Sequence, residues 1–290
     1  MTLVLENGGY RAELRPEAGG LIAGLQVLGA EGWIDLLLAE PPGGRSPHGM
    51  AHFGCFPMVP FANRLPQAWL PLGRGRAEFA RNWPPEGIAH HGTGWRAVWS
   101  CERTGPASVM MKTTIYDVDG DPLGVAGQDI RLDVEGLSVR LHYHHGHPEP
   151  MPAGVGLHPW FHAPDSQDTA RFMANGEYVM GKTHLGEGHR AKAGERRFSH
   201  ADAGFNGSFS GWDGKARIIR PSAGLVVNVT GVCDLIHAYV ATAFQAFCLE
   251  PVTHFPGAAH AGLAVPGQMR VLDQGDEISI TMRIDAEQAD

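Results

Sequence analysis

Glycine and proline interrupt this chain so often that long helices have little room to form. Its 290 residues include 39 Gly and 21 Pro, spread along the whole length. Both residues destabilise helix interiors and mark turns. No segment keeps apolar residues at a helical period over 12 or more positions. The chain is therefore expected to fold into short elements that are joined by many turns.

Apolar and polar residues alternate in many short segments, which is the pattern of half-buried β-strands. In one segment, Ile278, Ile280, Met282 and Ile284 alternate with polar residues. The other predicted strands include 3–5, 10–15, 21–28, 108–116, 139–143 and 224–230, and turns are predicted at 29–32, 117–120 and 212–215. Many short strands at hairpin spacing favour a β-sandwich or a barrel. No linker or internal repeat divides the chain, so residues 1–290 are predicted to form one all-β domain.

Composition excludes several classes of protein. The chain is 43% hydrophobic and 19% charged, and its net charge of −8 argues against nucleic acid or an anionic membrane as a partner. No apolar run is long enough to span a membrane, and the N-terminus lacks the pattern of a signal peptide. The four cysteines show no CxxC spacing, which favours free thiols in a reducing compartment. We therefore expect a cytoplasmic protein.

Two segments each carry one ionisable residue directly before a proline. The segment 154–161 (GVGLHPWF) contains His158, and the segment 248–256 (CLEPVTHFP) contains Glu250. A carboxylate and an imidazole are the usual pair for moving protons near neutral pH. The alternative is a core histidine bonded to a carbonyl and a glutamate that pairs with an arginine. If the two side chains meet, the sequence indicates an acid–base enzyme.

Two further segments carry polar groups suited to sugar hydroxyls. Asn63 and Arg64 follow a run of apolar residues, so the Arg64 guanidinium is expected to be partly buried and to need acceptors. The alternative is a structural arginine bonded to loop carbonyls. The segment 88–95 holds His91 and Trp95 among glycines, which allow the backbone to approach a ligand closely. The alternative for this segment is a loop in which His90 is exposed and Trp95 belongs to the core.

The histidines at 142–147 are the candidate metal site. Alternation along a strand places His142 and His144 on one face, at a spacing that can chelate. No carboxylate or cysteine nearby completes a recognised ligand pattern. Sixteen histidines also make chance clusters common. We therefore predict no metal.

Taken together, these segments resemble the aldose 1-epimerase (galactose mutarotase-like) family. The matching order is FPMVPFANR (56–64), HGTGW (91–95), GLHPWF (156–161), FSGWDG (209–214) and LEPVT (249–253). The opening also matches, with RPEAGG at 15–20 and DLL at 35–37. The similarity covers nearly the whole chain. It rests on the order and spacing of the five motifs.

The resemblance implies a large antiparallel β-sandwich, called a supersandwich, with a sugar bound in its concave cleft. It implies that Glu250 is the general base and His158 the general acid, with Arg64 and His91 binding the substrate. The family's further substrate-binding aspartate is matched by Asn206, which keeps an acceptor but loses the charge. Asp213 is a possible substitute, although its Asp-Gly context is typical of a hairpin turn.

The implied reaction interconverts the α and β anomers of an aldose and needs no cofactor. Glu250 takes a proton from the C1 hydroxyl while His158 protonates the ring oxygen. We expect a negative neighbour, such as Glu250, to favour the His158 imidazolium. Asn63 is expected beside Arg64 in the substrate site, and Trp95, Trp160 and Phe255 are expected to wall the cleft.

Three alternatives remain open from the sequence. The first is an epimerase of the same fold that acts on a hexose phosphate, with Arg74, Arg76 and Arg81 as the candidate phosphate ligands. The second is a sugar-binding or sensing protein without catalysis. The third is a metal-dependent sugar enzyme that uses the 142–147 histidines. The sequence does not identify the sugar or the oligomeric state.

Overall fold

The computed structural model describes residues 2–46 and 49–289, and most of them lie in β-strands. The strands are β1 (Leu3–Asn7), β2 (Tyr10–Arg15), β3 (Leu21–Gly29), β4 (Gly32–Asp35), β5 (Cys55–Met58), β6 (Arg64–Leu65), β7 (Trp69–Leu72), β8 (Gly75–Glu78), β9 (Ala89–His90), β10 (Ser100–Gly105), β11 (Ser108–Tyr116), β12 (Pro122–Asp133), β13 (Gly136–His145), β14 (Met151–Ala153), β15 (Gly156–His162), β16 (Thr169–Met180), β17 (Gly186–Ser199), β18 (Asn206–Ser210), β19 (Lys215–Arg220), β20 (Leu225–Val232), β21 (Leu235–Val240), β22 (Ala246–Val252), β23 (Arg270–Leu272) and β24 (Glu277–Gln288). Short 3-10 helices lie at η1 (Pro16–Ala18), η2 (Gly94–Arg96), η3 (His200–Asp202) and η4 (Pro221–Ala223). The all-β prediction is confirmed.

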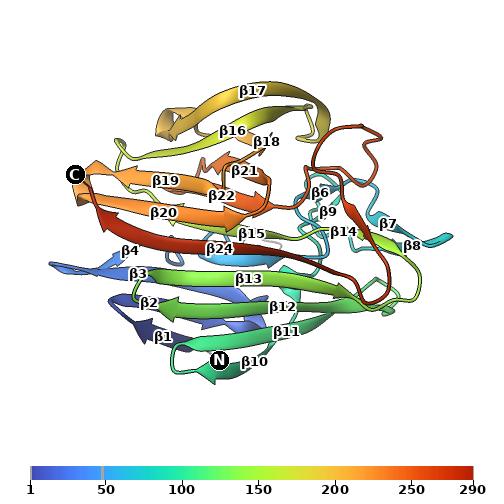
Figure 1. The fold of residues 1–290 in the computed structure, drawn as a ribbon, viewed down its shortest axis with the longest axis horizontal. Coiled ribbons are helices and arrows are strands. Elements are labelled where there is room, and N and C mark those ends of the chain that lie inside the picture. Colours follow the sequence, from blue (N-terminus) through green and yellow to red (C-terminus); the bar gives the residue numbers. More distant parts are fainter. Residues whose placement is uncertain (1, 47–48, 290) are drawn as a thin grey trace.

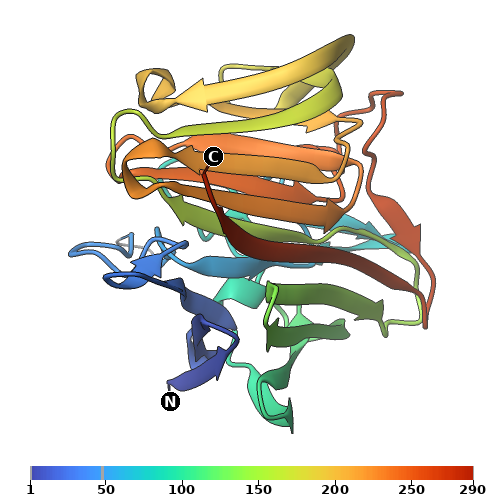
Figure 2. The ribbon, with the colours of Figure 1, turned by 60° about the vertical axis from the view of Figure 1, so that its left-hand side comes forward.

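The strands form two layers that continue into one another (Figure 1). One layer has the order β10-β11-β12-β13-β24-β20-β19-β16, and all of its neighbouring pairs are antiparallel. The other has the order β1-β2-β3-β5-β15-β22-β21-β18-β16, again antiparallel. β16 belongs to both layers, because its first part pairs with β19 and a later part with β18. In Figure 2 the N-terminal strands (blue) and β10–β13 (green) both lie at the end of the molecule away from β16 and β17 (yellow), and Asn7 Nδ2 of β1 donates to Leu132 O of β12 at 3.1 Å.

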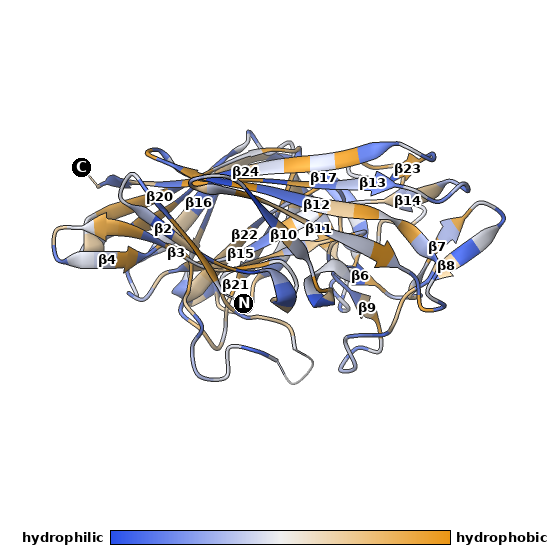
Figure 3. Ribbon diagram, turned by 90° about the horizontal axis from the view of Figure 1, so that it is seen from below, coloured by the Kyte–Doolittle hydropathy of each residue, from blue (hydrophilic) through white to orange (hydrophobic). Residues whose placement is uncertain are grey.

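The predicted alternation explains which side chains form the core. Along β24, Ile278, Ile280, Met282 and Ile284 are buried, and the residues between them are more exposed. Figure 3 shows this strand changing between hydrophobic and hydrophilic from residue to residue. Its neighbour β13 contributes Leu141, which is fully buried. The two layers thus bury their inward side chains in one large core, which burial of apolar surface stabilises.

The predicted turns all lie between consecutive strands, and the first two of them close hairpins. Residues 29–32 join β3 to β4, residues 117–120 lie between β11 and β12, and residues 212–215 lie between β18 and β19. Among the described residues, no helix is long and apolar enough to cross a membrane. All four cysteines are free, two of them buried and one exposed. Cytoplasmic localisation and the single domain over 1–290 stay predictions.

Candidate functional site

The structure brings His158 and Glu250 together on neighbouring strands. β15 pairs with β22, with Gly156 opposite Val252 and Trp160 opposite Cys248. This register sets His158 opposite Glu250, and His158 Nε2 lies 3.4 Å from Glu250 Oε1. The side chains are only 7% and 2% exposed. The proline after each residue favours the extended backbone that a strand needs.

Glu250 has a second histidine on its other side, which the sequence analysis missed. β21 pairs with β22 so that His237 lies opposite Glu250, and β18 places Ser208 opposite His237. On the far side, Phe56 of β5 lies opposite His158. Direct cross-strand neighbours share one face of a sheet. Five strands therefore present one continuous row of side chains, Phe56, His158, Glu250, His237 and Ser208.

A second row runs parallel to the first and is displaced from it by two residues. Because the strands are antiparallel, the displacement is toward higher numbers on β15 and β21 and toward lower numbers on β22 and β18. It contains Trp160 opposite Cys248, then Tyr239, then Asn206. The Trp160 indole stacks on His158, with ring centroids 5.5 Å apart and an interplanar angle of 9°. The Phe56 ring stacks on His158 at 4.6 Å. The imidazole is therefore held in place by an aromatic ring of each row.

Asn63 and His91 form the rim of the site, where two loops meet. Both have left-handed backbones, with φ of 57° and 58°. Such values are uncommon for residues other than glycine and cluster at functional sites. The two residues hold each other, because the His91 N–H donates to Asn63 O at 2.9 Å and the Asn63 N–H donates to His91 Nδ1 at 3.1 Å. In a neutral ring the proton of His91 therefore lies on Nε2.

A chain of hydrogen bonds runs from the rim to the floor. Arg64 donates to Asn63 Oδ1 through Nη1, at 3.1 Å. The Asn63 amide nitrogen then faces His237 Nε2 at 3.4 Å, and His237 Nδ1 lies 2.6 Å from Ser208 Oγ. Burial lowers the pKa of His237 to about 3, so the ring is neutral. With Nε2 accepting from Asn63, its proton lies on Nδ1 and is donated to Ser208.

These residues enclose a cavity of about 280 Å³. Small-molecule pockets typically measure about 300–1,000 Å³, so this cavity suits a small ligand. Its lining includes the predicted residues Asn63, Arg64, His91, His158, Trp160, Asn206 and Glu250, together with Met50, His52, Trp83, Glu86, His90, His237, Tyr239, Thr242, Ala243, Phe244. The structure therefore gathers seven of the eight predicted site residues around one space.

Trp95 and Phe255 do not line this cavity. The Trp95 indole is buried and donates its N–H to His90 O at 3.1 Å. Phe255 is fully buried and stacks on Tyr178 at 4.8 Å. Both belong to the smaller apolar cluster of the core. Trp95 was expected to wall the cleft, but it is a core residue, which is the alternative given for its loop in the sequence analysis.

Several polar atoms of the lining are buried without a hydrogen-bond partner among the described residues. They are Glu250 Oε2, His158 Nδ1, Asn206 Oδ1, Trp160 Nε1 and both ring nitrogens of His90. More than nine in ten buried polar groups in proteins have a partner. Unpaired donors and acceptors around one small cavity suit a ligand rich in hydroxyl groups.

Burial controls the protonation of the central pair. It raises the pKa of Glu250 well above the ordinary carboxyl value, and it lowers the pKa of His158 well below the ordinary imidazole value. The expectation that Glu250 favours the His158 imidazolium is therefore wrong for this structure. The cause is that burial penalises both charges. The neutral carboxylic acid and the neutral imidazole are favoured. In this form the pair's one transferable proton lies on Glu250.

Asp213 does not replace the family's aspartate. It lies in the segment between β18 and β19, where its Oδ1 accepts from the Lys215 N–H at 3.0 Å. These two strands pair with β16 and not with each other, so the segment connects the two layers and is not the hairpin turn that the Asp-Gly pair suggested. Among the described residues that line the cavity, the carboxylates are Glu250 and Glu86.

The histidines at 142–147 lie away from this cavity. His142 and His144 are close, with ring centroids 5.3 Å apart, as the alternation indicated. His144 Nε2 lies 2.8 Å from Glu277 Oε2, and His142 Nδ1 lies 3.6 Å from Asp129 Oδ2. Within residues 2–46 and 49–289, no group of three or more His, Cys, Asp or Glu side chains is arranged to hold a metal ion.

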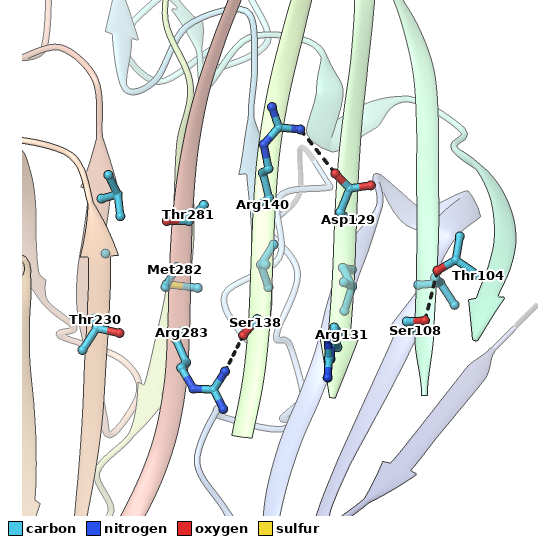
Figure 4. A pocket seen from close by; sticks show the side chains of 15 residues that line it. Thr104, Ser108, Asp129, Arg131, Ser138, Arg140, Thr230, Thr281, Met282 and Arg283 are labelled. Atoms are coloured by element: carbon cyan, nitrogen blue, oxygen red, sulfur yellow. Dashed lines mark hydrogen bonds and ion pairs between the residues drawn. The ribbon is translucent and has the colours of Figure 1, made fainter. Parts of the chain in front are cut away.

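A second hollow lies on the outer face of β11, β12, β13, β24 and β20 (Figure 4). Each of its charged side chains has a partner, either within the hollow or beside it. Arg140 lies 3.4 Å from Asp129, and Arg283 donates to Ser138 Oγ at 2.8 Å. It contains neither member of the His158–Glu250 pair. The buried cavity is therefore the better candidate for chemistry.

Comparisons with known proteins agree with this fold. A family model described as aldose 1-epimerase matches residues 1–285. The uncharacterized protein YphB of Escherichia coli K12 is 28% identical over 277 residues, covering 88% of this chain and 89% of that protein.

Solved structures show the same fold. A crystal structure from Escherichia coli K12, provisionally assigned as an aldose 1-epimerase, superposes with a TM-score of 0.83 at 24% identity, covering 99% of both chains. A galactose mutarotase-like protein from Clostridium acetobutylicum gives a TM-score of 0.81 at 17% identity, covering 99% of this chain and 95% of that one. The predicted supersandwich is thus confirmed. With the family model matching nearly its whole length, the chain belongs to the aldose 1-epimerase family.

Proposed function

We propose that this protein interconverts the α and β anomers of an aldose by opening and closing the sugar ring, with Glu250 and His158 as the acid–base pair. The observation that carries the proposal is their 3.4 Å approach on the floor of a small buried cavity. Family membership supports the reaction type. Arg64, His91, Asn63, Asn206 and Trp160 are proposed to bind the sugar.

The geometry suits the bonds that change. Ring opening removes a proton from the C1 hydroxyl and adds one to the ring oxygen, and both oxygens are bonded to C1. A base and an acid that serve them must reach adjacent atoms, each within about 2.6–3.2 Å. Side chains directly opposite each other on paired strands meet this requirement. The aromatic rings on either side fix the imidazole in that position.

The total number of protons on Glu250 and His158 stays the same throughout the cycle, and one of them moves between the two side chains by way of the sugar. With the cyclic sugar, the Glu250 carboxylate takes the C1 hydroxyl proton and the His158 imidazolium gives its proton to the ring oxygen. This leaves a carboxylic acid and a neutral imidazole beside the open aldehyde. Rotation about C1–C2 and the reverse transfers give the other anomer. The neutral form is the one that burial favours, so we expect the bound sugar to supply the hydrogen bonds that stabilise the charged form.

Polarimetry of freshly dissolved α-glucose, α-galactose and other aldoses tests the proposal. The purified protein should speed the approach to the equilibrium rotation for at least one sugar. Glu250→Gln should lower kcat by about 10²–10⁴, the usual contribution of a positioned acid or base. Excess chelator should leave the rate unchanged, because no step uses a metal. Equal rates for Glu250→Gln and wild type would rule out the catalytic assignment. Binding of a sugar without turnover would favour the sensing alternative.

A further inference from the structure

Arg64 and Glu86 form a two-pronged ion pair on the wall of the cavity. Arg64 Nε lies 2.8 Å from Glu86 Oε2, and Arg64 Nη2 lies 2.9 Å from Glu86 Oε1. The Arg64 side chain is 9% exposed and that of Glu86 is 33% exposed. A guanidinium has five N–H donors, and Glu86 and Asn63 together occupy three of them. Two donors remain for a ligand.

The segment that carries Glu86 is a short, constrained turn. Trp83 and Ile88 form a bridge, and the Glu86 and Gly87 N–H groups both donate to Trp83 O. Two consecutive prolines precede Glu86, and each fixes its own φ. The hydrogen bonds from Arg64 lower the pKa of Glu86, so its carboxylate stays charged at neutral pH. This charge is therefore held at one place beside the cavity.

Glu86 also separates the cavity from a group of basic residues. A neighbouring cavity of about 540 Å³ shares Arg64 and Glu86 with the first, and it is further lined by Arg81, Lys182 and His184. Arg81 donates to backbone carbonyls of its own wall, including Pro66 O at 2.9 Å. The Glu86 carboxylate therefore lies between a cationic region and the space proposed for the sugar.

Of the arginines considered above as phosphate ligands, only Arg81 lines either of these two cavities. Arg76 is 59% exposed and pairs with Glu78 at 2.6 Å on β8. Arg74 lies in the turn between β7 and β8. Two of these three cations are thus placed away from the site, and the third already has carbonyl partners.

We propose that Glu86 is a specificity-determining residue that makes the site prefer an uncharged aldose to an aldose phosphate. This inference rests on the function proposed above. A sugar hydroxyl both donates and accepts, so one hydroxyl can donate to the Glu86 carboxylate while its neighbour accepts from Arg64. A phosphate group has acceptors for Arg64 but is repelled by Glu86. Glu86 thereby supplies the carboxylate that the Asn206 position lacks, from a different part of the fold.

The test is the ratio of kcat/KM for the best neutral aldose to kcat/KM for its 6-phosphate. Glu86→Gln keeps the shape of the side chain and removes the charge. It should lower this ratio by about tenfold or more, the usual size of a hydrogen bond to a charged group. KM should rise for the neutral sugar and fall for the phosphate. A purely structural role would change both in the same direction, and that result would overturn the proposal.

Two further variants control this measurement. Glu78→Gln makes the same substitution in an ion-paired glutamate that lines neither cavity, and it should leave the ratio unchanged. Glu86→Asp keeps the charge on a shorter side chain and should keep the preference for the neutral sugar. Loss of the preference in Glu86→Asp as well as Glu86→Gln, with intact thermal melting curves, would show that shape and not charge sets the preference.

Binding of 1,5-anhydroglucitol separates this proposal from the proposed function. This sugar analogue has no anomeric hydroxyl, so its affinity can be measured without turnover. If wild type fails to turn over any aldose but binds the analogue, and Glu86→Gln weakens that binding about tenfold, the specificity role stands and the catalytic function fails. If wild type is active and Glu86→Gln changes neither the ratio nor the binding, the specificity role alone fails. Absence of both turnover and binding would overturn both.

Discussion

The same two residue types form a cross-strand pair at two places in this molecule. In the buried pair, His158 of β15 lies opposite Glu250 of β22, and the side chains are 7% and 2% exposed. In the exposed pair, His144 of β13 lies opposite Glu277 of β24, and the side chains are 50% and 28% exposed. The exposed pair has the shorter contact, 2.8 Å against 3.4 Å. Contact distance alone therefore does not distinguish a site from a surface ion pair.

The difference lies in the surroundings of each pair. Glu277 is 28% exposed and contacts the Arg140 guanidinium, whereas Glu250 Oε2 and His158 Nδ1 are buried with no partner in the described part of the chain. A buried pair near apolar rings has its protonation set by burial and by whatever ligand enters. An exposed pair is screened by solvent and salt. The comparison teaches that the strand register creates both pairs and that burial is what sets the pair proposed for proton transfer apart from the other.

Replacing the histidine of each pair should give the largest contrast. His158→Gln should lower kcat by about 10²–10⁴, because it removes the acid that protonates the ring oxygen. His144→Gln should leave kcat unchanged, because that ring is 50% exposed and does not line the cavity of the buried pair. Polarimetry with a single aldose measures both variants. A similar loss in the two, or none in either, would show that the buried pair has no special role.

Burial of Glu250 should make the stability of the protein depend on pH. Burial raises the folded-state pKa of Glu250, so between the unfolded value of about 4.3 and the raised value the folded state holds more protons than the unfolded state. Stability contributed by this group is therefore lost as the pH rises through that window. Glu250→Gln removes this titrating group. The melting temperature of Glu250→Gln should therefore rise relative to that of wild type as the pH increases from 4 to 8.

Glu277→Gln is the matched control for this measurement. It makes the same Glu-to-Gln substitution in the exposed pair, and it shows how far such a substitution shifts the melting temperature outside the buried cavity. Thermal melts followed by circular dichroism give both series. If the gap between Glu250→Gln and wild type were independent of pH, burial would not be raising the pKa of Glu250.

The sequence was sufficient to predict the fold class and most of the floor of the site. Alternation identified strands because it follows directly from the two faces of a sheet. Motif order identified His158 and Glu250, which are 92 positions apart in the numbering and meet only through the pairing of β15 with β22. His237 carries the same signal as His158, one histidine in an apolar strand, but it has no motif beside it. Only the register shows that it lies opposite Glu250.

The electrostatics could not be predicted from the sequence. Proximity of a carboxylate suggested an imidazolium at His158, yet the sign of its pKa shift depends on how deeply both groups are buried, which spacing does not reveal. Glu86 was missed for a related reason. It lies in a short turn with no motif around it, and its proposed role depends on the two contacts that it makes with Arg64, which is 22 positions away in the sequence.

The smallest expected effect concerns the stability of the exposed pair. Glu277 contacts both His144 and Arg140, and Arg140 keeps Asp129 as a second partner when Glu277 is replaced. Glu277→Gln should therefore lower the free energy of unfolding by no more than about 1 kcal/mol. Most of that loss should disappear in 1 M salt, where the Debye length falls to about 3 Å. Urea unfolding at low and high salt measures the difference. A loss of several kcal/mol that salt does not change would mean that this pair is shielded from water like His158 and Glu250, and burial would then no longer separate the two.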